Sequence, residues 1–214
     1  MPRSAKWLIA AWILLATVGM VGCAGSRDGT DTTPNAGTGS NGNSNHMEGN
    51  IMLTSSAFKS GTAIPTRYTS EGDDLSPPLA WSEAPAGVQS WAIICDDPDA
   101  PSPKKPAAEP WVHWVIYNIP ADARSLDEGT PRDAQLSQPQ GARQGKNSWS
   151  SDNVGYRGPM PPPGSGAHRY FFRIYALDSV LDLPPGRADK KSLLAAMKGH
   201  ILDQGQLIGA YERK

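Results

Sequence analysis

From about residue 50 to its end, the chain alternates short apolar runs with stretches that are dense in proline and glycine. Such runs predict β-strands, and the stretches between them predict turns. Strands are predicted at residues 51–53, 64–68, 90–96, 111–119 and 169–177. Pro77 and Pro78 predict a loop over residues 75–81, because proline has no N–H group to donate to a neighbouring strand.

One segment near the C-terminus has helical spacing instead. Apolar residues recur there every four positions, at Leu193, Met197 and Ile201. Asp189 is placed to cap a helix or to favour its N-terminal dipole, so a helix is predicted over residues 189–202. Gly205 is expected to end this helix, and residues 206–211 to return as a short strand.

Alternation along two of the predicted strands assigns side chains to opposite faces of a sheet. In the first strand, one face is predicted to carry Trp111, His113, Val115 and Tyr117, and the other Val112, Trp114 and Ile116. In the second, one face carries His168, Tyr170, Phe172 and Ile174, and the other Arg169, Phe171, Arg173 and Tyr175. The pattern predicts a mainly β domain with a histidine in or at the start of each of these strands.

Residues 1–22 have the pattern of a secretory signal peptide. Two basic residues precede the apolar run 7–20, and small residues follow it. The run is shorter than the about twenty residues that a membrane-spanning helix needs. Residues 20–23 resemble a bacterial lipobox, which implies that Cys23 is lipidated and becomes the mature N-terminus. An ordinary cleaved signal and an uncleaved anchor are the alternatives.

Polar residues dominate the segment 23–49, which therefore predicts a lipidated cysteine followed by a disordered tether. Residues 50–214 have the length of a single domain. We expect a membrane-anchored lipoprotein of the cell envelope, facing the periplasm or the exterior. Because Ala24 rather than an acid follows Cys23, the outer membrane is favoured if the host is Gram-negative.

Charge and cysteine content narrow the possible functions of the mature chain. Removal of residues 1–22 leaves 18 basic and 21 acidic side chains, a formal charge of −3, which gives no electrostatic case for binding nucleic acid. Cys95 has no cysteine partner within the domain, so no internal disulfide is expected. It lies in an apolar run and is predicted to be a buried small hydrophobe, with a catalytic nucleophile as the alternative.

Candidate chemistry lies where ionisable residues end or interrupt the predicted strands, because such groups are costly there unless they have a partner or a role. Asp97 and Asp99 lie in a proline-stiffened turn after the strand 90–96, and His113 lies within a strand. His168 opens another strand, and Tyr170 shares its face. We expect these side chains to converge on one small pocket.

The loop 155–166 is expected to form a wall of this pocket, because its glycines let backbone N–H groups approach a ligand and its prolines stiffen the rest. Two imidazoles, a tyrosine hydroxyl and loop amides suit a small anion, such as a phosphoryl or carboxylate group. Each residue taken alone also has a structural explanation. The acids can cap their own turn, and a histidine in a strand can bond to a backbone carbonyl.

A hydrolase and a metal-dependent enzyme are alternatives that use the same residues. Ser165 is close in sequence to His168, but no nucleophile-elbow pattern surrounds it. Asp97 and His113 could bind a metal together with His168, but the usual short ligand spacings are missing. We therefore expect a non-enzymatic protein without a cofactor.

Three segments together resemble the signature of the phosphatidylethanolamine-binding protein family, in its bacterial Raf-kinase-inhibitor-like branch. They are DPDAP at 97–101, WVHW at 111–114, and Gly158-Pro159 followed by HRY at 168–170. The resemblance covers nearly the whole domain and implies a large antiparallel sheet packed on a smaller one, with a few short helices and an anion pocket at one end. It implies that the ligand-binding residues are Asp97, Asp99, His113, Gly158, Pro159, His168 and Tyr170.

Two departures from the family limit what the resemblance implies. Eukaryotic members have a second histidine where Val112 stands, and a C-terminal helix that lines their pocket, whereas this chain ends at Lys214. Kinase inhibition depends on eukaryotic partners and is not carried over. We expect a small anionic or phosphorylated ligand, such as a lipid headgroup or a phosphorylated side chain, and membrane contact through Cys23. Modulation of another protein is compatible with this reading, and the sequence identifies no such partner.

Overall fold

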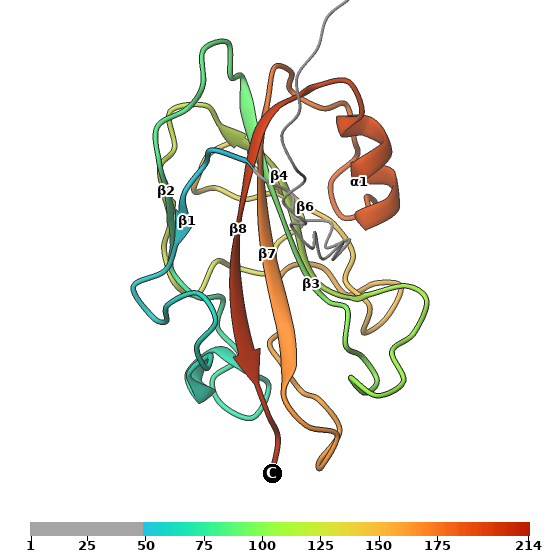
Figure 1. Ribbon diagram of the computed structural model, residues 1–214. Coiled ribbons are helices and arrows are strands. Elements are labelled where there is room, and N and C mark those ends of the chain that lie inside the picture. The colour runs from blue at the N-terminus through green and yellow to red at the C-terminus, as the bar shows by residue number, and fades with distance from the viewer. Residues whose placement is uncertain (1–48) are drawn as a thin grey trace, which may run out of the picture. The chain divides into compact units, whose positions relative to one another are not determined.

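The structure is a computed structural model that describes residues 49–214 as two antiparallel β-sheets and one α-helix (Figure 1). The large sheet has the strand order β6-β4-β3-β7-β8, and the small sheet has the order β1-β2-β5. The strands of the large sheet are β3 (Ser90–Asp97), β4 (Trp111–Pro120), β6 (Arg143–Gln144), β7 (His168–Leu177) and β8 (Ile201–Tyr211). The other elements are β1 (Leu53–Thr54), β2 (Leu79–Trp81), β5 (Ser125–Leu126), the 3-10 helix η1 (Thr66–Tyr68) and helix α1 (Lys190–Met197).

The predicted fold class, a mainly β domain with a large antiparallel sheet packed on a smaller one, is confirmed. The predicted signal peptide and Cys23 lie outside the described residues, as does all but the last residue of the predicted tether 23–49. Among residues 49–214, no helix has the length and apolarity that are needed to span a membrane.

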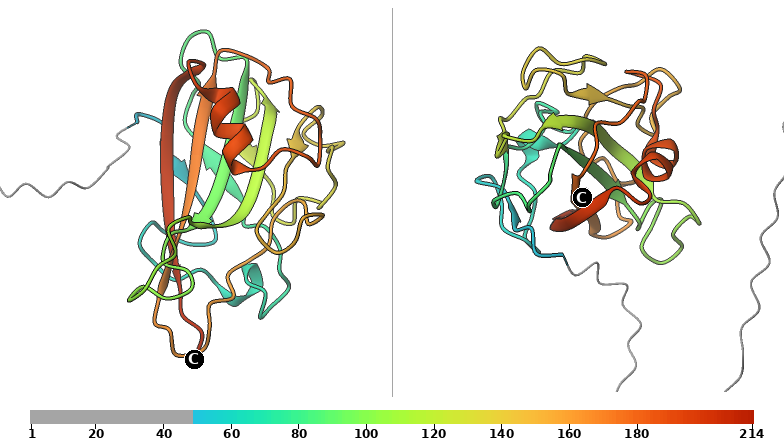
Figure 2. Two further views of the ribbon diagram at one scale, coloured as in Figure 1. Left: turned by 90° about the vertical axis from the view of Figure 1, so that its right-hand side faces the viewer. Right: turned by 90° about the horizontal axis from the view of Figure 1, so that it is seen from above.

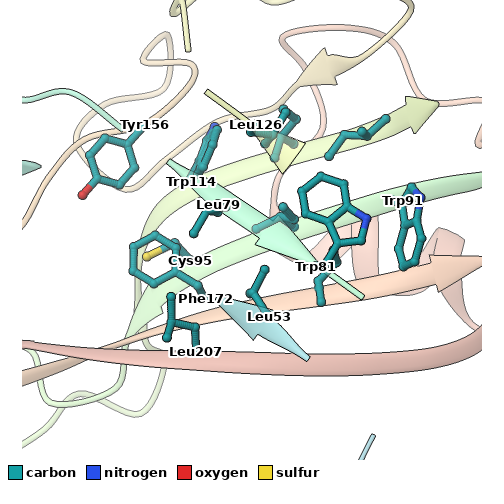
Figure 3. Packing of buried hydrophobic residues seen from close by; sticks show 14 of the residues in the cluster. Leu53, Leu79, Trp81, Trp91, Cys95, Trp114, Leu126, Tyr156, Phe172 and Leu207 are labelled. Atoms are coloured by element: carbon teal, nitrogen blue, oxygen red, sulfur yellow. The ribbon is translucent and has the colours of Figure 1, made fainter. Parts of the chain in front are cut away.

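Two apolar cores lie on opposite faces of the large sheet, one beneath the small sheet and one beneath α1 (Figure 1). The first core, part of which Figure 3 shows, joins the leucines of the small sheet to Trp91, Cys95, Trp114 and Phe172 of the large sheet. The second joins Leu193 and Met197 of α1 to Val115, Tyr117 and Tyr175. Burial of these large side chains is the main source of the stability of the fold.

Helix α1 begins at Lys190, one residue after the predicted start, and ends before the predicted end. The Asp189 carboxylate accepts a hydrogen bond from Ser192 N at 2.7 Å, and Ser192 Oγ accepts one from Asp189 N at 2.9 Å, which confirms Asp189 as the N-cap. Gly199 stops the chain from continuing as a helix, because its φ of +86° lies in the left-handed region. The predicted end at residue 202 is therefore wrong.

Gly205 was expected to end the helix but lies inside β8, which is longer than the predicted strand 206–211. A Cβ at this position would stand 1.9 Å from the carbonyl oxygen of Ile51. The glycine therefore lets the segment before β1 lie against the edge of the large sheet, where Ile51 N donates to Gln204 O at 3.1 Å.

The strands predicted at 90–96, 111–119 and 169–177 are present as β3, β4 and β7. The strand predicted at 64–68 is wrong, because the chain turns into η1, where Tyr68 N donates to Pro65 O at 2.9 Å. The loop predicted over 75–81 ends in β2, and the strand predicted at 51–53 begins at Leu53.

A β-bulge in β4 overturns the predicted face of His113. Cys95 pairs with Trp114, whereas the next residue, Asp96, pairs with Val112, so His113 is an extra residue with no partner on β3. His113 and Trp114 consequently lie on the same side of the sheet, and the ring of His113 meets the ring of Tyr170. The prediction that His113 shares a face with Val115 is wrong, because strict alternation fails at a bulge.

The faces predicted along β7 are confirmed, because β3 and β7 pair without a register shift. Tyr170, Phe172 and Ile174 belong to the core under the small sheet, and Tyr175 belongs to the core under α1.

Candidate ligand-binding pocket

A pocket of about 420 Å³ lies at the end of the large sheet where β3 ends and where β4 and β7 begin. Figure 2 shows that the loop after β3 and the loop before β7 gather at this end, near the C-terminus. We call this cavity the sheet-end pocket. Its lining has a polar part, made of Asp97, His113, His168 and Tyr170, and a largely apolar part, made of Ala100, Pro101, Ala107, Glu109, Trp111, Trp149, Met160, Pro161 and Pro162.

Asp97 and His168 form a buried pair in the floor of the sheet-end pocket. Asp97 ends β3 and His168 begins β7, and the carboxylate oxygen Oδ2 lies 2.8 Å from the ring nitrogen Nδ1. The other carboxylate oxygen accepts a hydrogen bond from Asp99 N at 2.7 Å. Burial raises the pKa of Asp97, although the hydrogen bonds from His168 and Asp99 act in the opposite direction. The structure thus brings together two residues that are 71 positions apart in the sequence.

The second nitrogen of His168, Nε2, lies 3.0 Å from Ser165 Oγ. Ser165 Oγ also lies 2.7 Å from the carbonyl oxygen of Pro162, to which it donates within its own turn. Ser165, His168 and Asp97 therefore form a continuous chain of polar contacts. Ser165 itself is outside the lining of the sheet-end pocket.

His113 reaches the sheet-end pocket because of the bulge in β4. Its Nδ1 lies 2.6 Å from the carbonyl oxygen of Arg157, and its ring meets the rings of Trp149 and Tyr170 edge to face, with centroids 4.8 and 5.0 Å apart. Burial lowers the pKa of His113 to about 4, although the bond to Arg157 O partly offsets the effect. The imidazole is therefore neutral at neutral pH.

Tyr170 supplies a buried hydroxyl group that has no hydrogen-bond partner among the described residues. Burial also raises the pKa of this phenol, so the group stays protonated and can donate. A buried unpartnered hydroxyl costs about 1–3 kcal/mol relative to a satisfied one. Because Tyr170 lines the sheet-end pocket, an acceptor atom of a ligand would remove this cost.

Asp99 does not line the sheet-end pocket. Its two oxygens accept hydrogen bonds from the guanidinium of Arg169, each at 2.8 Å, and Oδ2 also accepts from Arg169 N at 2.9 Å. The hydrogen bonds from Arg169 hold the pKa of Asp99 below its usual value. This pair ties the turn after β3 to the start of β7 and so fixes the relative positions of Asp97 and His168.

Gly158 and Pro159 also lie outside the lining, one turn behind the wall. Gly158 N donates to Asp74 Oδ1 at 2.7 Å, and Ser70 N donates to Pro159 O at 3.0 Å. A Cβ on Gly158 would stand 2.5 Å from the carbonyl oxygen of Tyr68. These two residues therefore hold the loop that presents the wall residues Met160, Pro161 and Pro162, which belong to the predicted wall segment 155–166.

Trp149 and Glu109 line the sheet-end pocket and were not predicted from the sequence. The ring of Trp149 lies edge to face on Trp111, with centroids 5.6 Å apart, and the guanidinium of Arg157 lies over it, 5.9 Å from its centroid. The available signal for Trp149 was a tryptophan in a polar loop, since binding residues are concentrated on loops.

The described residues contain no group of three or more histidine, cysteine or acidic side chains that could hold a metal ion. Cys95 is buried in the first core, and burial raises the pKa of its thiol well above the usual value. Cys95 therefore lies in an apolar environment, as was predicted for a buried small hydrophobic residue.

The fold and the site together define a mainly β domain with a cavity at one end of its large sheet. The family model described as phosphatidylethanolamine-binding protein matches residues 54–212. The chain therefore belongs to the phosphatidylethanolamine-binding protein family.

Similar proteins occur in archaea and bacteria. A UPF0098 protein of Methanothermobacter thermautotrophicus is 52% identical over 163 residues, which is 76% of this chain and 99% of that protein. A UPF0098 protein of Aquifex aeolicus is 44% identical over 167 residues, covering 77% of this chain and 91% of that protein.

Solved structures agree with the fold. Escherichia coli YbcL, described as a new member of the mammalian PEBP family, is 29% identical with a TM-score of 0.69, covering 77% of this chain and 99% of that chain. A Chlamydia trachomatis protein, CT736, is 39% identical with a TM-score of 0.65, covering 77% of this chain and 98% of that chain.

Proposed function

We propose that the domain binds the phosphoryl or related anionic group of an organic ligand in the sheet-end pocket and releases the ligand unchanged. The observation that supports this most strongly is the buried hydroxyl of Tyr170, a lining residue, because this hydroxyl has no hydrogen-bond partner among the described residues. An oxygen atom of an anion would accept its hydrogen bond. The adjacent His113 supplies a second polar contact, 5.0 Å away between ring centroids.

The apolar walls of the pocket favour an organic ligand over a free inorganic ion. Trp111, Trp149 and Met160 are large apolar side chains in the lining, and a pocket of about 420 Å³ is larger than an inorganic anion requires. A lipid headgroup and a phosphorylated small molecule share the required chemistry. Both present a phosphoryl group at one end and carbon at the other.

The experiment is an NMR titration of the imidazole signals with phosphoethanolamine and with inorganic phosphate. We expect the signals of His113 and His168 to shift, whereas those of His200, which pairs with Asp178 in an exposed position, should stay in place. His168→Ala should abolish the response, and His200→Ala should leave it intact. Unchanged signals at millimolar ligand would overturn the proposal.

A second candidate function, ester hydrolysis, is supported by the contacts that join Ser165, His168 and Asp97. They have the order of a nucleophile, a base and an acid that orients the base. The hydrogen bond from Ser165 to Pro162 O competes with activation of this hydroxyl, and for this reason binding is preferred. A fluorophosphonate probe distinguishes the two functions. Labelling that Ser165→Ala removes would support hydrolysis, and a protein that stays unlabelled would eliminate it.

We also propose that the domain is anchored to a membrane of the cell envelope through lipidated Cys23. The pattern of residues 1–23 supports this proposal. Cells fed radiolabelled palmitate should label the wild-type chain and leave Cys23→Ala unlabelled. Label that persists in the variant would refute the assignment.

A further inference from the structure

The polar floor of the sheet-end pocket carries no net charge. Ser165 has one hydroxyl proton and donates it to Pro162 O at 2.7 Å, so its contact with His168 Nε2 requires the ring nitrogen to be the donor. The distance of 2.8 Å between His168 Nδ1 and Asp97 Oδ2 then requires one further proton between these two atoms, because two lone pairs would repel each other. The pair is therefore either an imidazolium with a carboxylate or an imidazole with a carboxylic acid, and both have a net charge of zero.

His113 presents an acceptor to the pocket rather than a donor. A carbonyl oxygen only accepts, so the bond of 2.6 Å to Arg157 O places a proton on Nδ1. The ring is neutral above its pKa of about 4, so Nε2 holds a lone pair. The carboxylates of Asp96 and Asp74 favour protonation of the ring, and burial outweighs both.

Other ionisable groups surround His113 without changing this assignment. Tyr170 contacts the ring from β7, and its hydroxyl stays protonated. Glu109 shares the lining of the pocket and is exposed to solvent. Arg157 lies outside the lining of the pocket, and its guanidinium lies over Trp149, 3.1 Å from an Asp74 carboxylate that also pairs with Arg132.

We propose that the sheet-end pocket selects anions that carry their own proton, above all a singly protonated phosphoryl group. In this complex, a negatively charged oxygen of the ligand accepts from the hydroxyl of Tyr170, and the P–OH group of the ligand donates to Nε2 of His113. The pocket thus offers one hydrogen-bond donor and one acceptor, and the ligand offers the matching acceptor and donor. This inference rests on the proposed function and narrows its ligand to phosphate monoesters, because the phosphodiester of a lipid headgroup has no P–OH proton to donate near neutral pH.

Sulfate esters provide the contrast, because they have the same tetrahedral shape and no proton to donate near neutral pH. Their binding requires that His113 be protonated first, which costs about tenfold in affinity for each pH unit above a pKa of about 4. A phosphate monoester keeps its second proton up to a pH of about 6, so its affinity is affected only above that value.

Isothermal titration calorimetry of the wild-type domain with methyl phosphate and methyl sulfate tests the proposal. At a pH of about 5.5 both ligands are monoanions, and we expect methyl phosphate to bind at least about tenfold more tightly. At a pH of about 7.5, where free methyl phosphate is mostly a dianion, binding should take up close to one proton per ligand. Two buffers that differ in ionisation enthalpy measure this uptake.

His113→Gln is the matched variant, because its amide can offer either an N–H group or an oxygen to the ligand. In this variant the affinities for methyl phosphate and methyl sulfate should differ by no more than about threefold. If the variant does not fold, the comparison of the two ligands with the wild-type domain decides the question. Equal affinities without proton uptake would overturn the inference and leave the proposed function standing. If neither anion binds between about pH 5.5 and 7.5, both the inference and the proposed function fail.

Discussion

Asp96 and Asp97 are consecutive residues at the end of β3, yet they lie on opposite faces of the large sheet in different electrostatic environments. Asp96 is fully buried on the side of α1, where Arg173 pairs with one of its oxygens and Lys190 with the other. Asp97 lines the sheet-end pocket, and its ion-pair partner among residues 49–214 is a histidine, His168, rather than an arginine or a lysine. We infer that Asp96, which pairs with an arginine and a lysine, stabilises the fold. Asp97 has no such partner in the described part of the chain, so its contacts can change when a ligand binds.

The largest effect that we expect comes from replacing these two acids by asparagine. Asp96→Asn leaves Arg173 and Lys190 without their counter-charge and should cost about 3 kcal/mol of unfolding free energy. Asp97→Asn keeps an oxygen that can accept a hydrogen bond from a neutral His168 ring and should cost about 1 kcal/mol. Chemical denaturation at neutral pH measures both values.

Ligand binding should show the opposite order. Asp96→Asn should bind methyl phosphate with the affinity of the wild type, because its side chain lies on the face beneath α1. Asp97→Asn should change this affinity, because Asp97 lines the sheet-end pocket. Equal losses of stability in the two variants, or a binding defect confined to Asp96→Asn, would break the comparison.

The pH dependence of stability tests the environment of His113. Its pKa of about 4 in the folded protein lies below the value of 6.5 expected for an unfolded chain, so the unfolded state binds more protons between these two values. The unfolding free energy should therefore fall by about 3 kcal/mol as the pH is lowered through this window, and stay constant with respect to this group below it. The contribution is fully present above the unfolded pKa.

His113→Gln should lack this contribution. The difference in unfolding free energy between wild type and variant should therefore shrink as the pH falls from about 6.5 to about 4, while all other titrating groups cancel. If the difference stays constant over this range, His113 is not buried away from water in the way that the structure shows.

Alanine substitutions at Gly158 and Gly164 compare a closely packed position behind the pocket wall with an open position in the same loop. Gly158→Ala would place a Cβ 2.5 Å from Tyr68 O and should cost about 2–3 kcal/mol. Gly164 has no atom within 4 Å of such a Cβ, but its φ is +72°, so Gly164→Ala should cost only about 1 kcal/mol. Thermal unfolding compares the two, and a milder effect at Gly158 would contradict its role as a close contact behind the wall.

Much of the fold was predictable, because burial imposes a period on the sequence. The runs 90–96, 111–119 and 169–177 bury large side chains on both faces of the sheet, and such runs have few alternatives to a strand. Gly205 was wrongly predicted to end the helix, because a glycine that allows close approach of a neighbouring carbonyl cannot be told from a helix-ending glycine in the sequence. The strands β5 and β6 have two residues each, too few to show a period.

The candidate site was predictable as a set of residues and not as a geometry. Strand parity placed Tyr170 correctly relative to His168. It failed for His113, because a bulge depends on how β4 pairs with β3 and leaves no local mark in the sequence. The roles of Asp99 and Gly158 as supports were equally hidden, since they depend on contacts with Arg169 and Tyr68 that are distant in the sequence.

The smallest expected change in stability provides the most direct test of the central claim, that the sheet-end pocket is a site for an anion. Tyr170→Phe removes a buried hydroxyl that has no partner among the described residues. The unfolding free energy should stay the same or rise by about 1 kcal/mol, while the affinity for methyl phosphate should fall at least about tenfold. A loss of stability with unchanged affinity would mean that the hydroxyl serves the fold, and it would contradict the account.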